Sequence, residues 1–118
     1  MREEGKIDYI EIPVTDLVKT REFFSALYGW EFQEWGPDYF SFSDGRTDGG
    51  IRRAEEPAPA SGVLLVFYSN DLERDFERVK ELGATIRQEI FDFPGGRRFH
   101  FVDPAGTEFA MWATVEEQ

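Results

Sequence analysis

The sequence predicts an α+β fold in which one β-α-β-β-β pattern occurs twice. Two stretches carry this prediction because each contains a helix-capping aspartate, an apolar helix face and a closing glycine: Asp16–Gly29 and Asp71–Gly83. Their starts are offset by 71 − 16 = 55 residues and their ends by 83 − 29 = 54 residues. Runs that alternate apolar and polar residues flank both stretches and predict half-buried strands. Two such halves should pair to share a core, so we expect one domain over residues 1–118.

The first half, module one, is expected to span residues 6–53. Its first strand is predicted at Ile7–Val14, where apolar residues alternate with polar ones. The helix that ends at Gly29 follows. Three more strands are predicted at 30–35, 39–43 and 49–53. The Gly49-Gly50 pair in the last strand indicates a close backbone approach or a bulge.

The second half follows a linker, predicted at 54–61 from its prolines and its lack of apolar periodicity. Module two is expected to span residues 62–114. It opens with a strand at Val63–Tyr68, and the second helix follows. The last three strands are predicted at 85–90, 97–102 and 108–112. Asp103-Pro104-Ala105-Gly106 is a turn signal between the final two, because proline presets φ and glycine accepts positive φ.

Composition limits the possible functions. A chain of 118 residues with 41% hydrophobic residues can bury a core without disulfides. The net charge of −11 opposes binding to phosphate backbones and anionic membranes, so we expect no nucleic-acid or membrane partner. Cysteine is absent and the start, residues 1–6, is charged, which predicts no signal peptide and a cytoplasmic location.

Several segments resemble one known family when they are taken in order. Module one contains Ile12-Pro13-Val14-x-Asp16, then Phe23-Phe24, then Leu27–Phe32, and module two ends with Phe101–Phe109. In this order and spacing they resemble the vicinal oxygen chelate superfamily, which contains glyoxalase I, extradiol dioxygenases, and the bleomycin- and fosfomycin-resistance proteins. The resemblance implies two βαβββ modules whose mixed sheets curl into a half-open cup, with the helices on the convex face. It also implies a homodimer, because superfamily members often pair.

The resemblance further implies where a metal would bind. Metal-dependent members use His, Gln or Glu side chains from the first and last strands of the modules. The corresponding residues here are Tyr9, Leu64 and Ala110, and the last strand of module one, 49–53, contains no imidazole or carboxylate. These side chains are unsuited to divalent cations. We therefore expect no metal site and no cofactor.

The candidate ligand-binding residues are those expected to face the cup. They are Tyr9, Glu11, Leu64, Val66, Tyr68, His100, Ala110 and Trp112. Their aromatic and apolar members either line a pocket or form ordinary core, and both interpretations stay open.

The charged candidates also have two interpretations each. Glu11 is either a general base or anchor for a cationic group, or a carboxylate paired with an arginine such as Arg98. His100, the only histidine, is either a general base or metal ligand, or a partly exposed strand residue. Arg97 and Arg98 either bind an anion or form a solvated pair.

Three classes of function follow from these residues. We favour a metal-free binding module that holds a small organic molecule in the cup, as bleomycin-resistance proteins do. The alternative is a lyase, isomerase or dioxygenase-type enzyme with a non-standard site that includes Glu11, His100 or Glu108. The third class is a regulatory domain whose cup is filled by its own side chains.

Overall fold

The computed structural model of the protein describes residues 4–5, 7–58 and 62–115. Lys6, the first residue of the predicted module one, and residues 59–61 of the predicted linker lie outside the described residues, as do most of the charged start and the last three residues of the chain. The chain divides into two compact units, residues 1–58 and 59–118. Each unit contains one helix and one four-stranded mixed sheet, which confirms the predicted α+β class and the repeated βαβββ order. That both modules form one domain stays a prediction.

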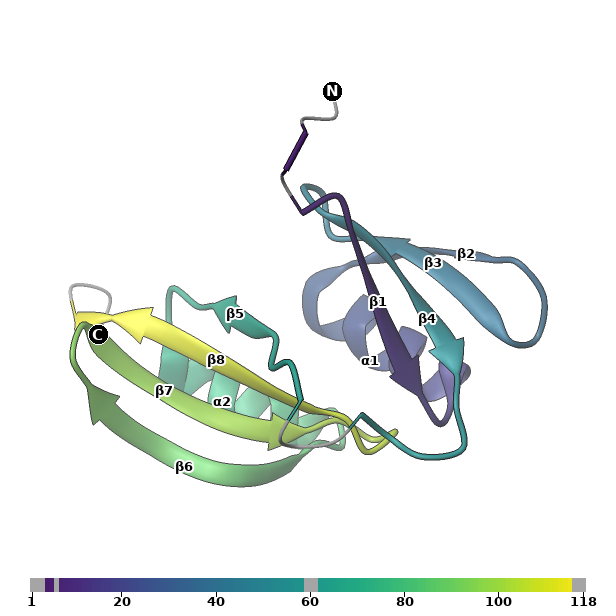
Figure 1. The fold of residues 1–118 in the computed structure, drawn as a ribbon. Coiled ribbons are helices and arrows are strands. Elements are labelled where there is room, and N and C mark those ends of the chain that lie inside the picture. The colour runs from purple at the N-terminus through teal and green to yellow at the C-terminus, as the bar shows by residue number, and fades with distance from the viewer. Residues whose placement is uncertain (1–3, 6, 59–61, 116–118) are drawn as a thin grey trace. The chain divides into compact units, whose positions relative to one another are not determined.

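Unit 1 holds the first four strands and the first helix (Figure 1). The element order is β1 (Tyr9–Val14), α1 (Leu17–Tyr28), β2 (Glu31–Glu34), β3 (Tyr39–Ser43) and β4 (Asp48–Arg53). The strands lie in the order β1-β4-β3-β2. β1 pairs in parallel with β4, whereas β2, β3 and β4 form an antiparallel meander. The first strand of the module therefore pairs with its last.

Unit 2 repeats this topology. The element order is β5 (Val66–Tyr68), α2 (Leu72–Glu81), β6 (Thr85–Phe93), β7 (Gly96–Val102) and β8 (Glu108–Thr114). The strands lie in the order β5-β8-β7-β6, with β5 parallel to β8. Neither α1 nor α2, the helices of the described chain, is long and apolar enough to cross a membrane.

The prediction of a strand over Val63–Tyr68 is wrong at its start. β5 has only three residues, and Val63–Leu65 have no regular secondary structure. Val66 pairs with Ala110 in the parallel ladder, and the Leu65 carbonyl still accepts a hydrogen bond from the Ala110 N–H at 3.1 Å. The regular strand nevertheless begins only at Val66, although β8 already starts at Glu108 and the sequence alternates normally over 63–65.

Both helices begin as the sequence predicts. The Asp16 carboxylate accepts a hydrogen bond from the Lys19 N–H at 3.0 Å, and the Asp71 carboxylate accepts one from the Arg74 N–H at 3.1 Å. These bonds satisfy N–H groups that have no partner within the helix. Gly29 ends α1 with φ of +74°, a conformation that costs glycine little.

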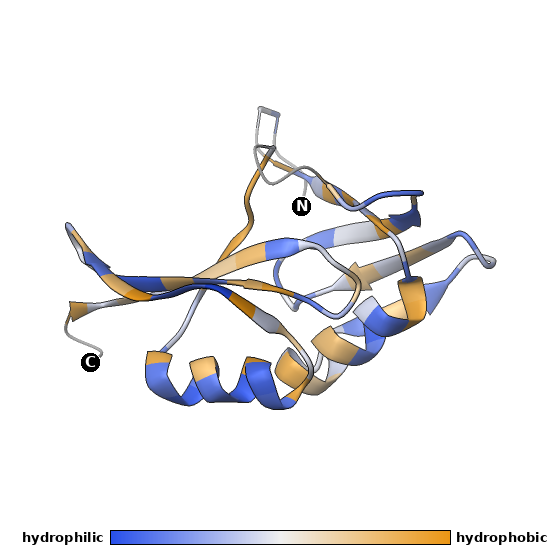
Figure 2. Cartoon of the chain, turned by 90° about the horizontal axis from the view of Figure 1, so that it is seen from below, coloured by the Kyte–Doolittle hydropathy of each residue, from blue (hydrophilic) through white to orange (hydrophobic). Residues whose placement is uncertain are grey.

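Each helix covers one face of its own sheet and buries an aromatic core there. In unit 1 the Trp30 ring stacks between Phe24, at a centroid distance of 4.5 Å, and Phe42, at 4.7 Å. In unit 2 Phe99, Phe101 and Phe109 are fully buried. Figure 2 shows α2 on the left with hydrophobic residues toward the sheet and hydrophilic residues away from it. Within each unit, as far as the structure describes it, the helix leaves the opposite face of the sheet uncovered.

The Gly49-Gly50 pair confirms the predicted close approach, and the two glycines are crowded by different atoms. A Cβ on Gly49 would lie 2.3 Å from the Ile10 carbonyl oxygen of the neighbouring strand β1. A Cβ on Gly50 would meet the hydroxyl ends of Tyr39 at 1.9 Å and Tyr9 at 2.5 Å. Backbone cannot move aside without opening the sheet, whereas the end of a side chain can rotate away.

We therefore expect Gly49→Ala to destabilise the protein more than Gly50→Ala. The first substitution forces β1 and β4 apart and should lower the free energy of unfolding by about 3 kcal/mol, at the upper end of overpacking costs. The second should cost about 1 kcal/mol, because only the two tyrosine rings must move. Urea denaturation followed by tryptophan fluorescence measures both values. Equal losses for the two variants would contradict this account of the glycine pair.

Candidate functional site

Most of the predicted site residues lie on the open face of a sheet, by which we mean the face opposite its helix. Pairing registers and alternation place them there: Tyr9 and Glu11 on β1, Val66 and Tyr68 on β5, His100 on β7, and Ala110 and Trp112 on β8. Leu64 is the exception, since it precedes β5 in a segment without secondary structure. Ala110 has no exposed surface, because its registered neighbours Val66 and His100 flank it.

The open face of unit 1 carries a hydrogen-bonded network around Glu11. The Tyr39 hydroxyl donates to Glu11 Oε1 at 3.1 Å, and Arg52 Nε lies 3.2 Å from Glu11 Oε2. The Tyr9 and Tyr39 hydroxyls lie 2.5 Å apart, above Gly50. The arginine that pairs with Glu11 is thus Arg52 and not Arg98. Parallel pairing of β1 with β4 brings residues 11 and 52 together, which the sequence alone does not reveal.

Tyr39 acts as a donor in this network. Burial, and then its hydrogen bonds to Tyr9 and Glu11, raise the pKa of the Tyr39 hydroxyl above its ordinary value. The phenol therefore keeps its proton at neutral pH and holds the Glu11 carboxylate in place. With both carboxylate oxygens engaged, Glu11 is an ion-paired group and not a free general base.

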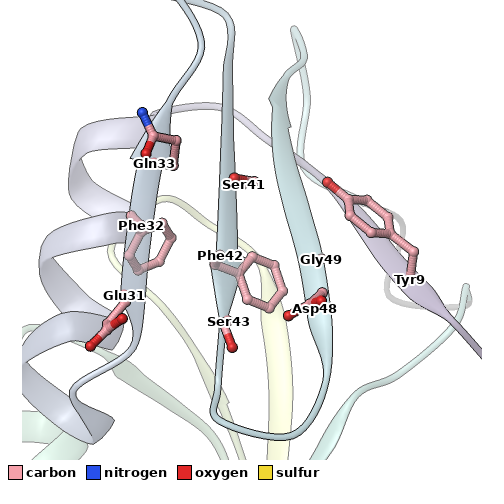
Figure 3. Close-up of a pocket in the computed structure, with 9 residues that line it drawn as sticks. All are labelled: Tyr9, Glu31, Phe32, Gln33, Ser41, Phe42, Ser43, Asp48 and Gly49. Atoms are coloured by element: carbon pink, nitrogen blue, oxygen red, sulfur yellow. The ribbon is translucent and has the colours of Figure 1, made fainter. Parts of the chain in front are cut away.

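A hollow of about 410 Å³ opens beside this network in unit 1 (Figure 3). Its lining comes from all four strands: Tyr9, Glu31, Phe32, Gln33, Ser41, Phe42, Ser43, Asp48 and Gly49. Tyr9 is the only predicted site residue among them. Two serines and two carboxylates lie among these residues beside three aromatic rings, so the hollow offers polar as well as aromatic contacts.

The open face of unit 2 is aromatic. The Trp112 ring has its centroid 5.2 Å from that of Tyr68 in an edge-to-face arrangement and 6.1 Å from that of Phe93. Phe91 stacks on the His100 ring at 6.1 Å. We call these four aromatic residues, Tyr68, Phe91, Phe93 and Trp112, the aromatic frame. Tyr68 is 45% exposed, so part of the frame faces solvent.

A chain of polar contacts runs between the aromatic side chains. Arg98 Nη2 lies 3.1 Å from His100 Nε2, and His100 Nδ1 lies 3.0 Å from Glu108 Oε2. A guanidinium group can only donate, so His100 Nε2 accepts and Nδ1 carries the proton that it donates to Glu108. The three side chains thus fix a neutral imidazole in one tautomer. His100 has both ring nitrogens engaged and does not offer a free base.

Arg97 and Arg98 do not form the solvated pair that the sequence allowed. Alternation along β7 sends Arg97 to the helix side, where its guanidinium binds Glu73 of α2 at 2.5 Å. Arg98 lies on the open face, with its guanidinium carbon 5.9 Å from the centroid of the Phe93 ring. Its Nε is buried and has no hydrogen-bond partner among the described residues.

Sequence reasoning missed Phe91, Phe93 and the role of Glu108 as the partner of His100. Glu108 was detectable, because the turn at Asp103–Gly106 fixes the hairpin register that puts it beside His100. The two phenylalanines were not, because β6 contains irregularities in its register at residues 86–91 that break simple alternation.

Metal ligands do not converge within the part of the chain that the structure describes. No group of three His, Asp or Glu side chains there is placed to hold an ion. His100 and Glu108 are neighbours, but both are engaged with arginines as well. The donors present on either open face therefore do not fit a three-ligand site.

Asp103 is a buried carboxylate in the β7–β8 turn. Its Oδ1 accepts the N–H groups of Ala105 at 3.1 Å and Thr107 at 2.9 Å, whereas Oδ2 is buried without a partner among the described residues. Burial raises the pKa of this carboxyl to about 6, against the opposing effect of the backbone hydrogen bonds. Gly106 completes the turn with φ of +95°, as the sequence predicts.

Comparison with known proteins gives one family. The model of the Glyoxalase/Bleomycin resistance protein/Dioxygenase superfamily matches residues 6–111. A glyoxylase-like domain-containing protein of Didymella fabae is 31% identical over 95 residues, which are 73% of this chain and 74% of that protein. The anthracycline biosynthesis protein DauV of Streptomyces sp. (strain C5) is 24% identical over 112 residues, which are 91% of this chain but only 41% of that protein.

Solved structures share the fold at low sequence identity. The fosfomycin resistance protein FosX of Listeria monocytogenes has a TM-score of 0.80 at 22% identity and covers 98% of this chain and 96% of its own. TioX of Micromonospora sp. ML1 has a TM-score of 0.69 at 20% identity, and the match covers 94% of this chain and 100% of TioX. Lactoylglutathione lyase of Agrobacterium tumefaciens has a TM-score of 0.71 at 19% identity, and the match covers 95% of this chain and 96% of the lyase.

The raised pKa of Asp103 predicts a specific pH dependence of stability. Between its ordinary value of 3.8 and about 6 the folded protein binds a proton that the unfolded chain does not, so stability falls as pH rises through this window. Asp103→Asn keeps the acceptor oxygen but cannot ionise. Relative to this variant, the wild type should lose about 2.5 kcal/mol of unfolding free energy between pH 4 and pH 7. Urea denaturation across this pH range measures the difference.

Asp44→Asn is the matched control. Asp44 Oδ1 also accepts two turn N–H groups, from Arg46 at 2.8 Å and Thr47 at 2.6 Å, but its side chain is exposed. A pH-dependent change as large for Asp44→Asn as for Asp103→Asn would show that burial of Asp103 is not the cause.

Proposed function

Because the chain belongs to the Glyoxalase/Bleomycin resistance protein/Dioxygenase superfamily, we propose that it is a metal-free member that binds a small, mainly aromatic organic molecule. The aromatic frame on the open face of unit 2 is the observation that supports this best. Rings that contact one another edge-to-face or at a tilt, and that are partly exposed, offer a ready surface for another ring. Trp112 and Tyr68, both candidates from the sequence, belong to this frame.

The state of the polar groups favours binding over catalysis. His100 has no free nitrogen, and Glu11 is held by Tyr39 and Arg52. A general base needs a lone pair within reach of a substrate proton. Groups that are already saturated with partners instead fix the shape of a binding surface.

A second candidate function is a lyase or isomerase of the same superfamily. The hydrogen bond of His100 to Glu108 favours it, because a carboxylate that orients an imidazole is a common acid–base arrangement. For this pair to act, Arg98 must leave His100 Nε2 when substrate binds. The homodimer and the cytoplasmic location expected from the sequence stay predictions.

The binding proposal predicts that the neutral aromatic probe N-phenyl-1-naphthylamine binds one site per chain. Trp112→Ala should weaken its affinity by about 10-fold, because loss of one stacked ring removes roughly 1–1.5 kcal/mol. Titration followed by probe fluorescence measures the affinity. Trp35→Ala is the control, since Trp35 is a 68% exposed tryptophan of unit 1 outside the aromatic frame. Equal affinity of the wild type and Trp112→Ala would rule out this surface as the binding site.

The metal-free part of the proposal predicts only loose, salt-sensitive binding of divalent cations. Acidic proteins attract such ions weakly, so the number and strength of sites decide the question. Metal-stripped protein would be titrated with Ni²⁺, Zn²⁺, Mn²⁺ and Fe²⁺ in a calorimeter at moderate salt. The contrary result would be a single tight metal site per chain that Glu11→Gln or His100→Ala abolishes. Metal-dependent enzyme chemistry would then be favoured over metal-free binding.

A further inference from the structure

We propose that the open face of unit 2 recognises aromatic molecules that carry an oxyanion, such as a carboxylate, sulfonate or phosphonate, and that Arg98 contacts this group. The inference rests on the proposed function, because the aromatic frame is taken as the surface that holds the ring. It adds that the ligand is negatively charged and that Arg98 binds the charged group.

The unsatisfied nitrogen of Arg98 is the first observation behind this inference. Nε is buried without a hydrogen-bond partner among the described residues, and a buried unpaired donor is costly. Nη2 spends one N–H on His100 Nε2 and has a second one. Nε and a terminal nitrogen together form the two-pronged edge that binds the two oxygens of an oxyanion. An arriving anion would therefore satisfy a donor that the free protein leaves unpaired.

The surroundings of Arg98 provide the second observation. His100, which Glu108 holds through the other ring nitrogen, contacts the guanidinium, and the Phe93 ring lies 5.9 Å from its central carbon. In the ladder Arg98 pairs directly with Trp112 and Phe91. An anion on Arg98 would thus place an attached ring against the aromatic frame, and the orientation of the guanidinium is set before the ligand binds.

Local charge agrees with an anionic ligand despite the net charge of −11. Glu108 is the carboxylate of the polar chain, and it is shared between His100 at 3.0 Å and Arg87 Nε at 3.9 Å. This series of polar contacts therefore contains two guanidinium groups, of Arg98 and Arg87, and one carboxylate around a neutral imidazole. This excess of positive charge beside partly buried rings attracts an anion where exposed acidic surfaces repel it.

The test compares two probes with the same N-phenylnaphthylamine skeleton. 8-Anilino-1-naphthalenesulfonate carries a sulfonate, and N-phenyl-1-naphthylamine is neutral. We expect Arg98→Gln to weaken sulfonate-probe binding by about 10-fold or more, since a charge-assisted hydrogen-bonded pair is lost. The neutral probe should change by less than about twofold. Arg98→Lys, which keeps the charge but loses the planar fork, should give an intermediate loss for the sulfonate probe.

Arg97→Gln is the matched control, because Arg97 is the adjacent arginine on the helix side of β7 and binds Glu73. It should leave the affinities of both probes unchanged. Thermal melting followed by circular dichroism confirms that each variant is folded, and Arg98→Lys carries the test if Arg98→Gln does not fold. The titration must give a stoichiometry of one sulfonate probe per protein chain. This probe also binds loosely packed, partly unfolded proteins, and such binding would give a higher stoichiometry.

The outcomes separate the two claims. If both probes bind and depend on Trp112 but neither responds to Arg98→Gln or Arg98→Lys, the oxyanion inference is overturned while the binding function stands. If neither probe binds, or binding ignores Trp112, the proposed function fails and the inference fails with it. Loss of the sulfonate probe alone on changing Arg98, with Arg97→Gln silent, supports both.

Discussion

The helix that covers only one face of each four-stranded sheet is the constraint on which the rest of this structure depends. It favours apolar residues at the positions that face the helix, so Phe99 and Phe101 of β7 are fully buried while Arg98 and His100, which alternate with them, are not. The aromatic core can then be thick, as the stack of Trp30 between two phenylalanines shows. The opposite face is not covered by that helix, so its residues can be polar or aromatic.

The two open faces use this freedom differently although their topology is the same. In unit 1 phenol, carboxylate and guanidinium groups bond to one another around Glu11, and the tyrosine hydroxyls fill the space above Gly50. In unit 2 the rings of Tyr68 and Trp112 meet at an edge, while the polar chain ends in an arginine nitrogen without a partner. The first face is satisfied within itself, and the second is not. This difference makes unit 2 the better candidate for recognition.

Local signals in the sequence predict the fold well. Asp16 and Asp71 bond to N–H groups three residues away, and Gly29 and Gly106 adopt positive φ, so each acts through its immediate neighbours. The site depends on distant residues instead. Glu11 meets Arg52 only because β1 pairs in parallel with β4. In β6, residues 88 and 91 oppose residues 100 and 98, so three steps on one strand match two on the other. The residues of β6 alone do not predict this irregularity in its pairing with β7.

Pairing of the first strand of each module with its last has a consequence for folding during synthesis. Tyr9 pairs with Asp48, 48 − 9 = 39 residues later, and Val66 pairs with Ala110, 110 − 66 = 44 residues later. Closing loops of this length must precede the gain from the ladder, which slows folding of such topologies. On the ribosome β1 therefore emerges before β4, its pairing partner, and remains unpaired until β4 has been translated. The second module repeats this wait, because β5 gains its partner only when the final strand leaves the exit tunnel.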